Sequence, residues 1–222
     1  MVDNRIGILA FMNDGGLGAQ TRRLTYMINP YRLLVVDSSG FSKNKVQHPE
    51  WYSSYNGYIV DGFPTNINCR KFVNGLEHIL VCENPLNYYM ISYAHHVKAK
   101  TYIQVNYEFL DTLANPSLPL PTKFLMPSYW MIDEMIKLYG KDRVMYLPPP
   151  IDMHEFDDAY RGNKGNTGKF RILHMIGTLA AHDRNGTLDL IKALPQIKSD
   201  FELVIHSQSE LPKEYITKDE RV

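Results

Sequence analysis

The chain has 222 residues, of which 24 are basic and 24 acidic, and 44% are hydrophobic. This length suits one large domain or an ordinary domain with a smaller one, and the apolar content is sufficient for a packed core. The zero formal net charge provides no field that would attract a phosphate backbone or an anionic membrane, which argues against non-specific nucleic-acid binding.

Features that direct a chain to another compartment are missing from the sequence. No stretch approaches the roughly 20 apolar residues of a membrane helix, and the first apolar run lacks the flanks of a signal peptide. Cys69 and Cys82, the two cysteines, lack the spacing of metal ligands. We therefore expect a reduced, cytoplasmic protein without a membrane span, a metal site or a cofactor.

The first predicted element is a buried strand over residues 5–12, followed by a glycine loop and a helix over 19–28. Continuous apolar strands are typical of parallel sheets covered on both faces. The loop would present backbone amides at a helix N-terminus, where a phosphate or carboxylate binds favourably. The alternative is a tight turn that lets the helix approach the strand. The candidate ligand-binding residues of the loop are Gly15, Gly16 and Gly18, with Asp14 in the cleft beside them.

Strands and helices alternate through the next 119 residues, 29–147. The predicted strands are 31–37, 57–61, 78–83, 101–109, 123–126 and 143–147, and the predicted helices are 66–77, 85–96 and 129–139, the last capped by Ser128. This pattern predicts an α/β fold with a Rossmann-like parallel sheet of six or seven strands and helices on both faces. In strand 101–109, Gln104, Asn106 and Glu108 alternate with apolar residues and would face the crevice where ligands bind, although a solvated edge strand also alternates.

A polar segment separates this domain from a second one. Three prolines, Pro148 to Pro150, end the last strand, and residues 161–169 contain no apolar side chain. The chain restarts with a strand over 170–176, a helix over 187–194 and a strand over 201–206. The predicted domains are therefore 1–160, a flexible linker over 161–169, and a partial βαβ unit over 170–222, with a ligand cleft between the two α/β units. One helix and two strands are too few to bury both faces of this unit.

Three features together resemble the GT-B fold, and specifically the retaining glycosyltransferases of group 4. They are the glycine loop, the sequence Leu-Pro-Pro-Pro-Ile-Asp over residues 147–152, and the strand ending at Gly177 that leads to Asp-Arg-Asn-Gly-Thr over 183–187. The resemblance implies transfer of a sugar from a nucleotide-sugar donor to an acceptor. The donor would bind mainly to the C-terminal domain and the acceptor to the N-terminal one. The sequence has no D-x-D pair, so we expect metal-independent transfer.

The resemblance also implies a donor-binding role for the loop after the second-domain strand. Family members usually have an arginine after its glycine and a lysine before its later glycine, and this chain has Thr178 and Asn185 there. Arg184 is the substitute cation for a diphosphate, since a guanidinium can pair with two phosphate oxygens at once. The candidate donor residues of this loop are Gly177, Thr178, His182 and Arg184. No catalytic residue can be assigned.

The resemblance covers only about half of such an enzyme's usual length, because the remainder of the donor domain does not occur before Val222. We therefore expect a truncated or partial glycosyltransferase. The alternative is a non-catalytic binding or assembly protein that forms a homodimer through its C-terminal unit. The acceptor stays unidentified. The aromatic-rich loop of Phe41, Trp51, Tyr52 and Tyr55 could stack on a sugar or base, although such aromatics more often pack within the loop. Some related bacteriophage enzymes modify nucleobases, but the neutral charge of this chain gives no support for that acceptor.

Overall fold

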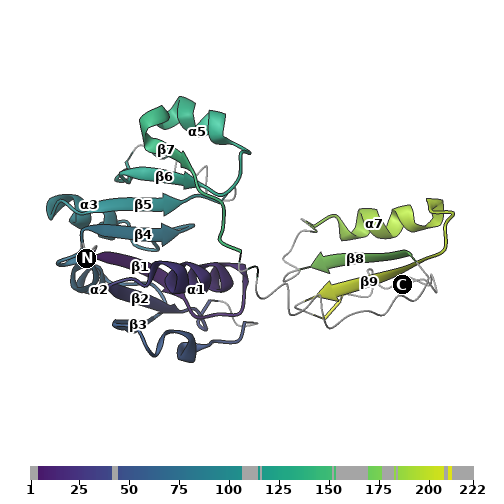
Figure 1. Cartoon of the computed structure of the whole chain (residues 1–222), viewed down its shortest axis with the longest axis horizontal. Helices are drawn as coiled ribbons and strands as arrows, with labels where there is room; N and C mark the ends of the chain where they lie inside the picture. Colours follow the sequence, from purple (N-terminus) through teal and green to yellow (C-terminus); the bar gives the residue numbers. More distant parts are fainter. Residues whose placement is uncertain are drawn as a thin grey trace. The chain divides into compact units, whose positions relative to one another are not determined.

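A computed structural model of the chain describes residues 5–41, 45–106, 115, 117–151, 153, 170–176, 183, 185–207 and 210–211. The chain divides into two compact units, Met1–Asp152 and Met153–Val222, and each is described by itself (Figure 1). No helix within the described ranges is long and apolar enough to cross a membrane.

The first unit is built on a parallel sheet of seven strands in the order β3-β2-β1-β4-β5-β6-β7. The strands are β1 (Ile6–Phe11), β2 (Arg32–Asp37), β3 (Gly57–Asp61), β4 (His78–Cys82), β5 (Lys100–Gln104), β6 (Lys123–Met126) and β7 (Val144–Tyr146). The predicted α/β fold with a Rossmann-like parallel sheet is thereby confirmed. β1 is an inner strand, paired with β2 on one side and β4 on the other.

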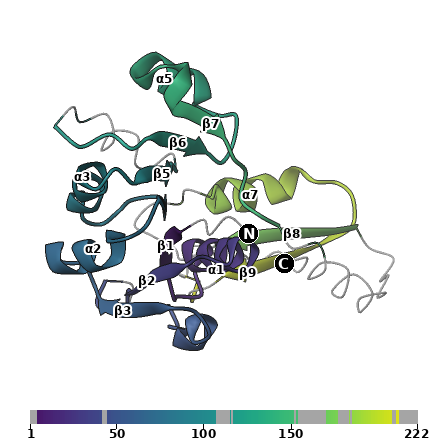
Figure 2. The same cartoon turned by 60° about the vertical axis from the view of Figure 1, so that its left-hand side comes forward.

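Helices cover both faces of this sheet, as the sequence predicts. Helix α1 (Gly16–Ile28) lies on one face, together with the short 3-10 helix η1 (Pro49–Tyr52), whose Tyr52 packs against the same core. Helices α2 (Asn66–Val73) and α3 (Tyr89–His96) lie on the other face (Figures 1 and 2). Helix α5 (Ile132–Tyr139) packs with this second group through its buried Met135, and the short 3-10 turn η3 (Lys141–Arg143) leads into β7.

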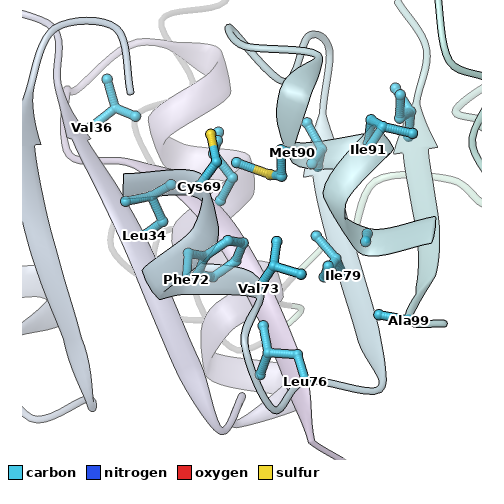
Figure 3. Close-up of a cluster of buried hydrophobic side chains, with 14 of the residues drawn as sticks. Leu34, Val36, Cys69, Phe72, Val73, Leu76, Ile79, Met90, Ile91 and Ala99 are labelled. Atoms are coloured by element: carbon cyan, nitrogen blue, oxygen red, sulfur yellow. The ribbon is translucent and has the colours of Figure 1, made fainter. Parts of the chain in front are cut away.

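The core beneath α2 and α3 shows why the sequence folds in this way (Figure 3). Cys69, Phe72 and Val73 of α2 are fully buried, because positions three and four residues apart lie on one face of a helix. Thr65 starts α2 with a capping box, in which its hydroxyl accepts from the Asn68 amide at 3.2 Å. Gly7 of β1 leaves room for this packing, since a Cβ there would lie 2.9 Å from Cζ of Phe72.

Three helices begin elsewhere than the sequence predicts. Helix α1 begins at Gly16 instead of residue 19, so the glycine loop supplies its first turn. Helix α3 begins at Tyr89 instead of following Pro85, because Leu86 has a left-handed backbone with φ 59° that a helix cannot include. Helix α5 begins at Ile132 instead of residue 129 because Met131 has φ 70°, and Ser128 therefore does not cap it.

The second unit contains the predicted βαβ arrangement. Strands β8 (Phe170–Ile176) and β9 (Phe201–Ser207) pair in parallel, and helix α7 (Thr187–Ala193) runs into the 3-10 turn η4 (Leu194–Gln196). Leu194, Phe201 and Leu203 form a small buried cluster with partly buried neighbours from α7 and β8. On these strands Leu173 and Met175 are 61% and 65% exposed. Within its described residues, this unit therefore leaves apolar side chains of its sheet uncovered, as expected from its small size.

Candidate functional site

The carboxyl ends of β1, β4 and β5 lie next to one another at one edge of the sheet. The chain leaves β1 toward β2 and β3 and later returns to β4 on the opposite side, so the strand order reverses between β1 and β4. In open parallel sheets, ligands bind outside the carboxyl ends of the strands at such a reversal. The loops that follow β1, β4 and β5 therefore form the candidate site.

The glycine loop after β1 is shaped by a buried asparagine. Asn13 is 3% exposed; its side-chain amide donates to the Ser38 hydroxyl at 2.9 Å, and its side-chain oxygen accepts from the Gly15 amide at 2.9 Å. These contacts hold the loop in the conformation that begins α1. The exposed Asp14 is anchored through its backbone, whose amide donates to the Val46 carbonyl at 3.0 Å.

Gly18 allows α1 to lie directly against this loop. A Cβ at Gly18 would lie 1.7 Å from the Asn13 carbonyl oxygen, whereas one at Gly16 would meet nothing within 4 Å. Helix α1 therefore approaches the end of β1 closely at Gly18, which was the alternative role of the glycine loop. It also places the amides of Gly16, Leu17 and Gly18 in the first turn of α1, where no acceptor occurs among the described residues. Such amides favour an anion.

Lys45 brings a positive charge to the same place. Its Nζ lies 2.5 Å from where a Cβ of Gly15 would be, so the ammonium occupies the space that this glycine leaves open. The segment that carries Lys45 runs antiparallel to the glycine loop, with a bridge between Asn13 and Gln47 and a bond of 2.5 Å from the His48 amide to the Met12 carbonyl. Across the described parts of the chain, no carboxylate pairs with Lys45.

A cation beside a helix N-terminus is electrostatically unfavourable, because the helix dipole already places a partial positive charge there. The Lys45 ammonium beside Gly15 and the first-turn amides of α1 therefore both favour a negatively charged ligand at this end of the helix. Sequence reasoning missed Lys45, since it lies in a loop 30 residues after Gly15 and matches no motif. Lys45 comes close to Gly15 only in the folded chain, where the two segments lie side by side.

The hydroxyls of Tyr52 and Thr21 connect the elements around the glycine loop through hydrogen bonds to backbone carbonyls. The Tyr52 hydroxyl donates to the Phe11 carbonyl at 3.0 Å, and the buried Thr21 hydroxyl donates to the Gly18 carbonyl at 3.1 Å. Burial raises the pKa of Tyr52 to about 12, so its hydroxyl stays protonated at neutral pH and can donate. Tyr52 is 5% exposed and Trp51 is enclosed by His48 and Arg22, so loop packing explains these two aromatics.

Gln104, one of the predicted cleft residues, links neighbouring elements through its buried side chain. It ends β5 and is 2% exposed. Its side-chain nitrogen donates to the Leu147 carbonyl at 3.3 Å, and its side-chain oxygen accepts from Gln20 of α1. The Cys82 thiol lies 3.5 Å from the same oxygen. Gln104 therefore ties α1, β4 and the segment after β7 together at the candidate site.

Asn106, a second predicted cleft residue, holds a carboxylate at the next strand end. Its side-chain nitrogen donates to Oε1 of Glu83 at 2.6 Å. Glu83 follows β4 directly, its amide donates to the Gln104 carbonyl at 2.8 Å, and its backbone is left-handed with φ 66°. Strained residues of this kind concentrate at functional sites. Sequence reasoning missed Glu83, although an acidic residue directly after a buried strand was a usable signal.

The remaining predicted site residues lie outside the described part of the chain. They are Glu108 of the cleft and Gly177, Thr178, His182 and Arg184 of the donor loop. The neighbouring Asp183 is described, and its carboxylate accepts from the amides of Leu188 at 2.6 Å and Thr187 at 2.9 Å. These bonds lower the pKa of Asp183. The amides of Thr187 and Leu188 at the start of α7 thus have an acceptor, whereas no described residue accepts from the first amides of α1.

No protein-family model matches the chain, and no curated protein sequence matches it. Among solved structures, the fold is similar to a UGT transferase from Siraitia grosvenorii in complex with UDP, with a TM-score of 0.47 and 9% identity. The likeness covers 96% of this chain and 67% of that one. A likeness of this strength does not bear on function, so the candidate site rests on its own geometry.

Proposed function

We propose that the chain binds the diphosphate of a nucleotide-sugar donor at the glycine loop and acts in transfer of the sugar to an acceptor hydroxyl. The observation that carries this proposal is the Lys45 ammonium beside Gly15, the residue directly before the amides of Gly16, Leu17 and Gly18, for which no described acceptor occurs. Backbone amides and an ammonium are the groups with which proteins hold phosphates. The sequence motifs that resemble group 4 glycosyltransferases support the same chemistry.

In this proposal the glycine loop stabilises the leaving group. The bond between the anomeric carbon and the diphosphate oxygen breaks, and the negative charge that develops on that oxygen is balanced by the amides and Lys45 without a metal ion. The acceptor oxygen forms the new bond to the anomeric carbon. In this proposal Glu83, whose carboxylate Asn106 holds at the neighbouring strand end, takes the proton of the acceptor hydroxyl.

Arg184 of the predicted donor loop is the other candidate cation for the diphosphate. The transferred sugar is a hexose or a pentose. The second candidate function, a binding or assembly protein, is favoured by the exposed Leu173 and Met175 of the β8–β9 sheet. It predicts a stable dimer that binds no nucleotide.

Calorimetric titration of the full chain with UDP, GDP and ADP tests the proposal. We expect saturable binding of at least one diphosphate, and we expect Lys45→Ala to weaken it by roughly ten- to a hundredfold, because a hydrogen bond to a charged group contributes about 1.5–3 kcal/mol. Lys71→Ala is the matched control, since Lys71 is an exposed lysine of α2 on the other face of the sheet.

The variants separate the alternatives. If Arg184→Ala abolishes binding and Lys45→Ala leaves it unchanged, the diphosphate is held by the predicted donor loop and the role of the glycine loop is wrong. If none of the diphosphates binds and the chain sediments as a dimer, the proposed sugar transfer is wrong and the assembly function is supported.

A further inference from the structure

Three exposed or half-exposed aromatic residues lie at the carboxyl edge of the sheet, beyond the candidate site. Tyr129 and Trp130 follow β6 and are 75% and 72% exposed, and Tyr146 ends β7 and is 39% exposed. The rings of Tyr129 and Tyr146 stack with centroids 4.2 Å apart and an interplanar angle of 17°. We name these three residues the aromatic shelf. Tyr129 and Trp130 belong to the segment between β6 and α5, and Tyr146 belongs to β7; Figure 1 labels these elements.

The backbone that presents the shelf is strained. The sequence favours a helix from residue 129, which would place both aromatics on its first turn, yet α5 begins only at Ile132. The cause is Met131, whose φ of 70° and ψ of 6° are left-handed for a side chain that gains no local hydrogen bond from that conformation. The turn instead closes through a bond of 3.3 Å from the Ile132 amide to the Tyr129 carbonyl. Places where local sequence preference is overridden in this way are often functional.

The charges beside the shelf indicate which ligand fits it. Asp133 and Glu134 are exposed on the first turn of α5, and no lysine or arginine occurs in the sequence between Lys123 and Lys137. A nucleic acid strand or an anionic membrane would require cations here. Aromatic faces beside carboxylates suit a neutral carbohydrate, because the rings cover the C–H face of a pyranose and the carboxylates accept hydrogen bonds from its hydroxyls.

We propose that the aromatic shelf binds a neutral oligosaccharide, which serves as the acceptor. The acceptor role rests on the proposed sugar transfer, whereas oligosaccharide binding itself does not. The shelf lies on the strands β6 and β7, and the candidate site lies at β1, β4 and β5 of the same sheet edge. Tyr129 and Trp130 stack on the sugar ring, and Asp133 and Glu134 bind its hydroxyls.

The chain carries its own reporter for this binding. Trp51 and Trp130 are the two tryptophans, and Trp51 is enclosed by His48 and Arg22. In a Trp51→Phe background, Trp130 is the sole tryptophan, and its fluorescence can be titrated with maltohexaose, cellohexaose, mannohexaose and xylohexaose. We expect a saturable change with at least one of these sugars. Tyr129→Ala should weaken it by about tenfold, because stacking on one ring contributes about this much to affinity.

Tyr26→Ala is the matched control, since Tyr26 is 77% exposed on α1 and lies outside the shelf. It should leave the oligosaccharide affinity unchanged. The proposal is overturned if no hexasaccharide changes Trp130 fluorescence, if Tyr26→Ala weakens binding as much as Tyr129→Ala, or if only oligothymidylate or phosphatidylglycerol vesicles produce the change.

Nucleotide binding separates this proposal from the one on which its acceptor role rests. Calorimetry with UDP, GDP and ADP on the same variants should show no effect of Tyr129→Ala. Oligosaccharide binding without diphosphate binding would support the aromatic shelf as an oligosaccharide site and contradict the proposed sugar transfer. Diphosphate binding without oligosaccharide binding would support the diphosphate site and contradict the role of the aromatic shelf.

Discussion

Gly18→Ala is expected to lower the free energy of unfolding by about 3 kcal/mol, at the upper end of the range for overpacked sites. The new methyl group would lie 1.7 Å from the Asn13 carbonyl oxygen, which is backbone and is held in place by the contacts of the Asn13 side chain. Neither loop nor helix can move without breaking these bonds. Urea denaturation followed by circular dichroism measures the change, and diphosphate affinity should fall with it, because the first turn of α1 must shift.

Gly16→Ala is the matched control two residues earlier in the same turn. A Cβ there meets nothing within 4 Å, and Gly16 has no positive φ. Replacing glycine by alanine at such a position of a helix is neutral or stabilises by up to about 1 kcal/mol. Equal destabilisation by both variants would show that helix and loop do not approach one another as closely as Gly18 requires.

Phe72→Ala is expected to lower the free energy of unfolding by about 3–5 kcal/mol, which is the usual cost of removing a buried phenylalanine ring. Phe72 is fully buried in the core that joins α2 and α3 to β1 and β2 (Figure 3). A loss of this size is a large fraction of the roughly 5–15 kcal/mol by which domains are stable. The midpoint of urea unfolding at 25 °C should fall accordingly.

Ile67→Ala, on the same helix, provides the comparison. Ile67 is 65% exposed, so its truncation removes little packing and should change the free energy of unfolding by no more than about 0.5 kcal/mol. A similar loss from both substitutions would contradict the orientation of α2 on the sheet.

Much of the first unit could be predicted because its signals are local. The runs at β1, β2 and β4 are continuously apolar, which indicates strands covered on both faces, and all of them lie where the sequence places them. Helix starts were less predictable. Ser128 is a good capping residue, but Met131 adopts a left-handed conformation that no local preference of methionine indicates.

The candidate site was predictable only where a motif marks it. Gly15, Gly16 and Gly18 stand out because three glycines follow a buried strand. Lys45 and Glu83 do not, since each reaches the site through long-range pairing, Lys45 beside Gly15 and Glu83 beside Asn106. The shelf was missed for a related reason. Aromatic content drew attention to Trp51 and Tyr52, whereas exposure, which the sequence does not contain, distinguishes Tyr129 and Trp130.

Amide NMR of the ¹⁵N-labelled chain during titration with the diphosphate that binds best tests the central claim most directly. If the glycine loop holds the diphosphate, the amide resonances of Gly16, Leu17 and Gly18 shift together and saturate at the calorimetric affinity, since a bound phosphate oxygen deshields the N–H groups that donate to it. Saturable shifts elsewhere, with these three amides unchanged, would contradict the account and place the diphosphate in another part of the chain.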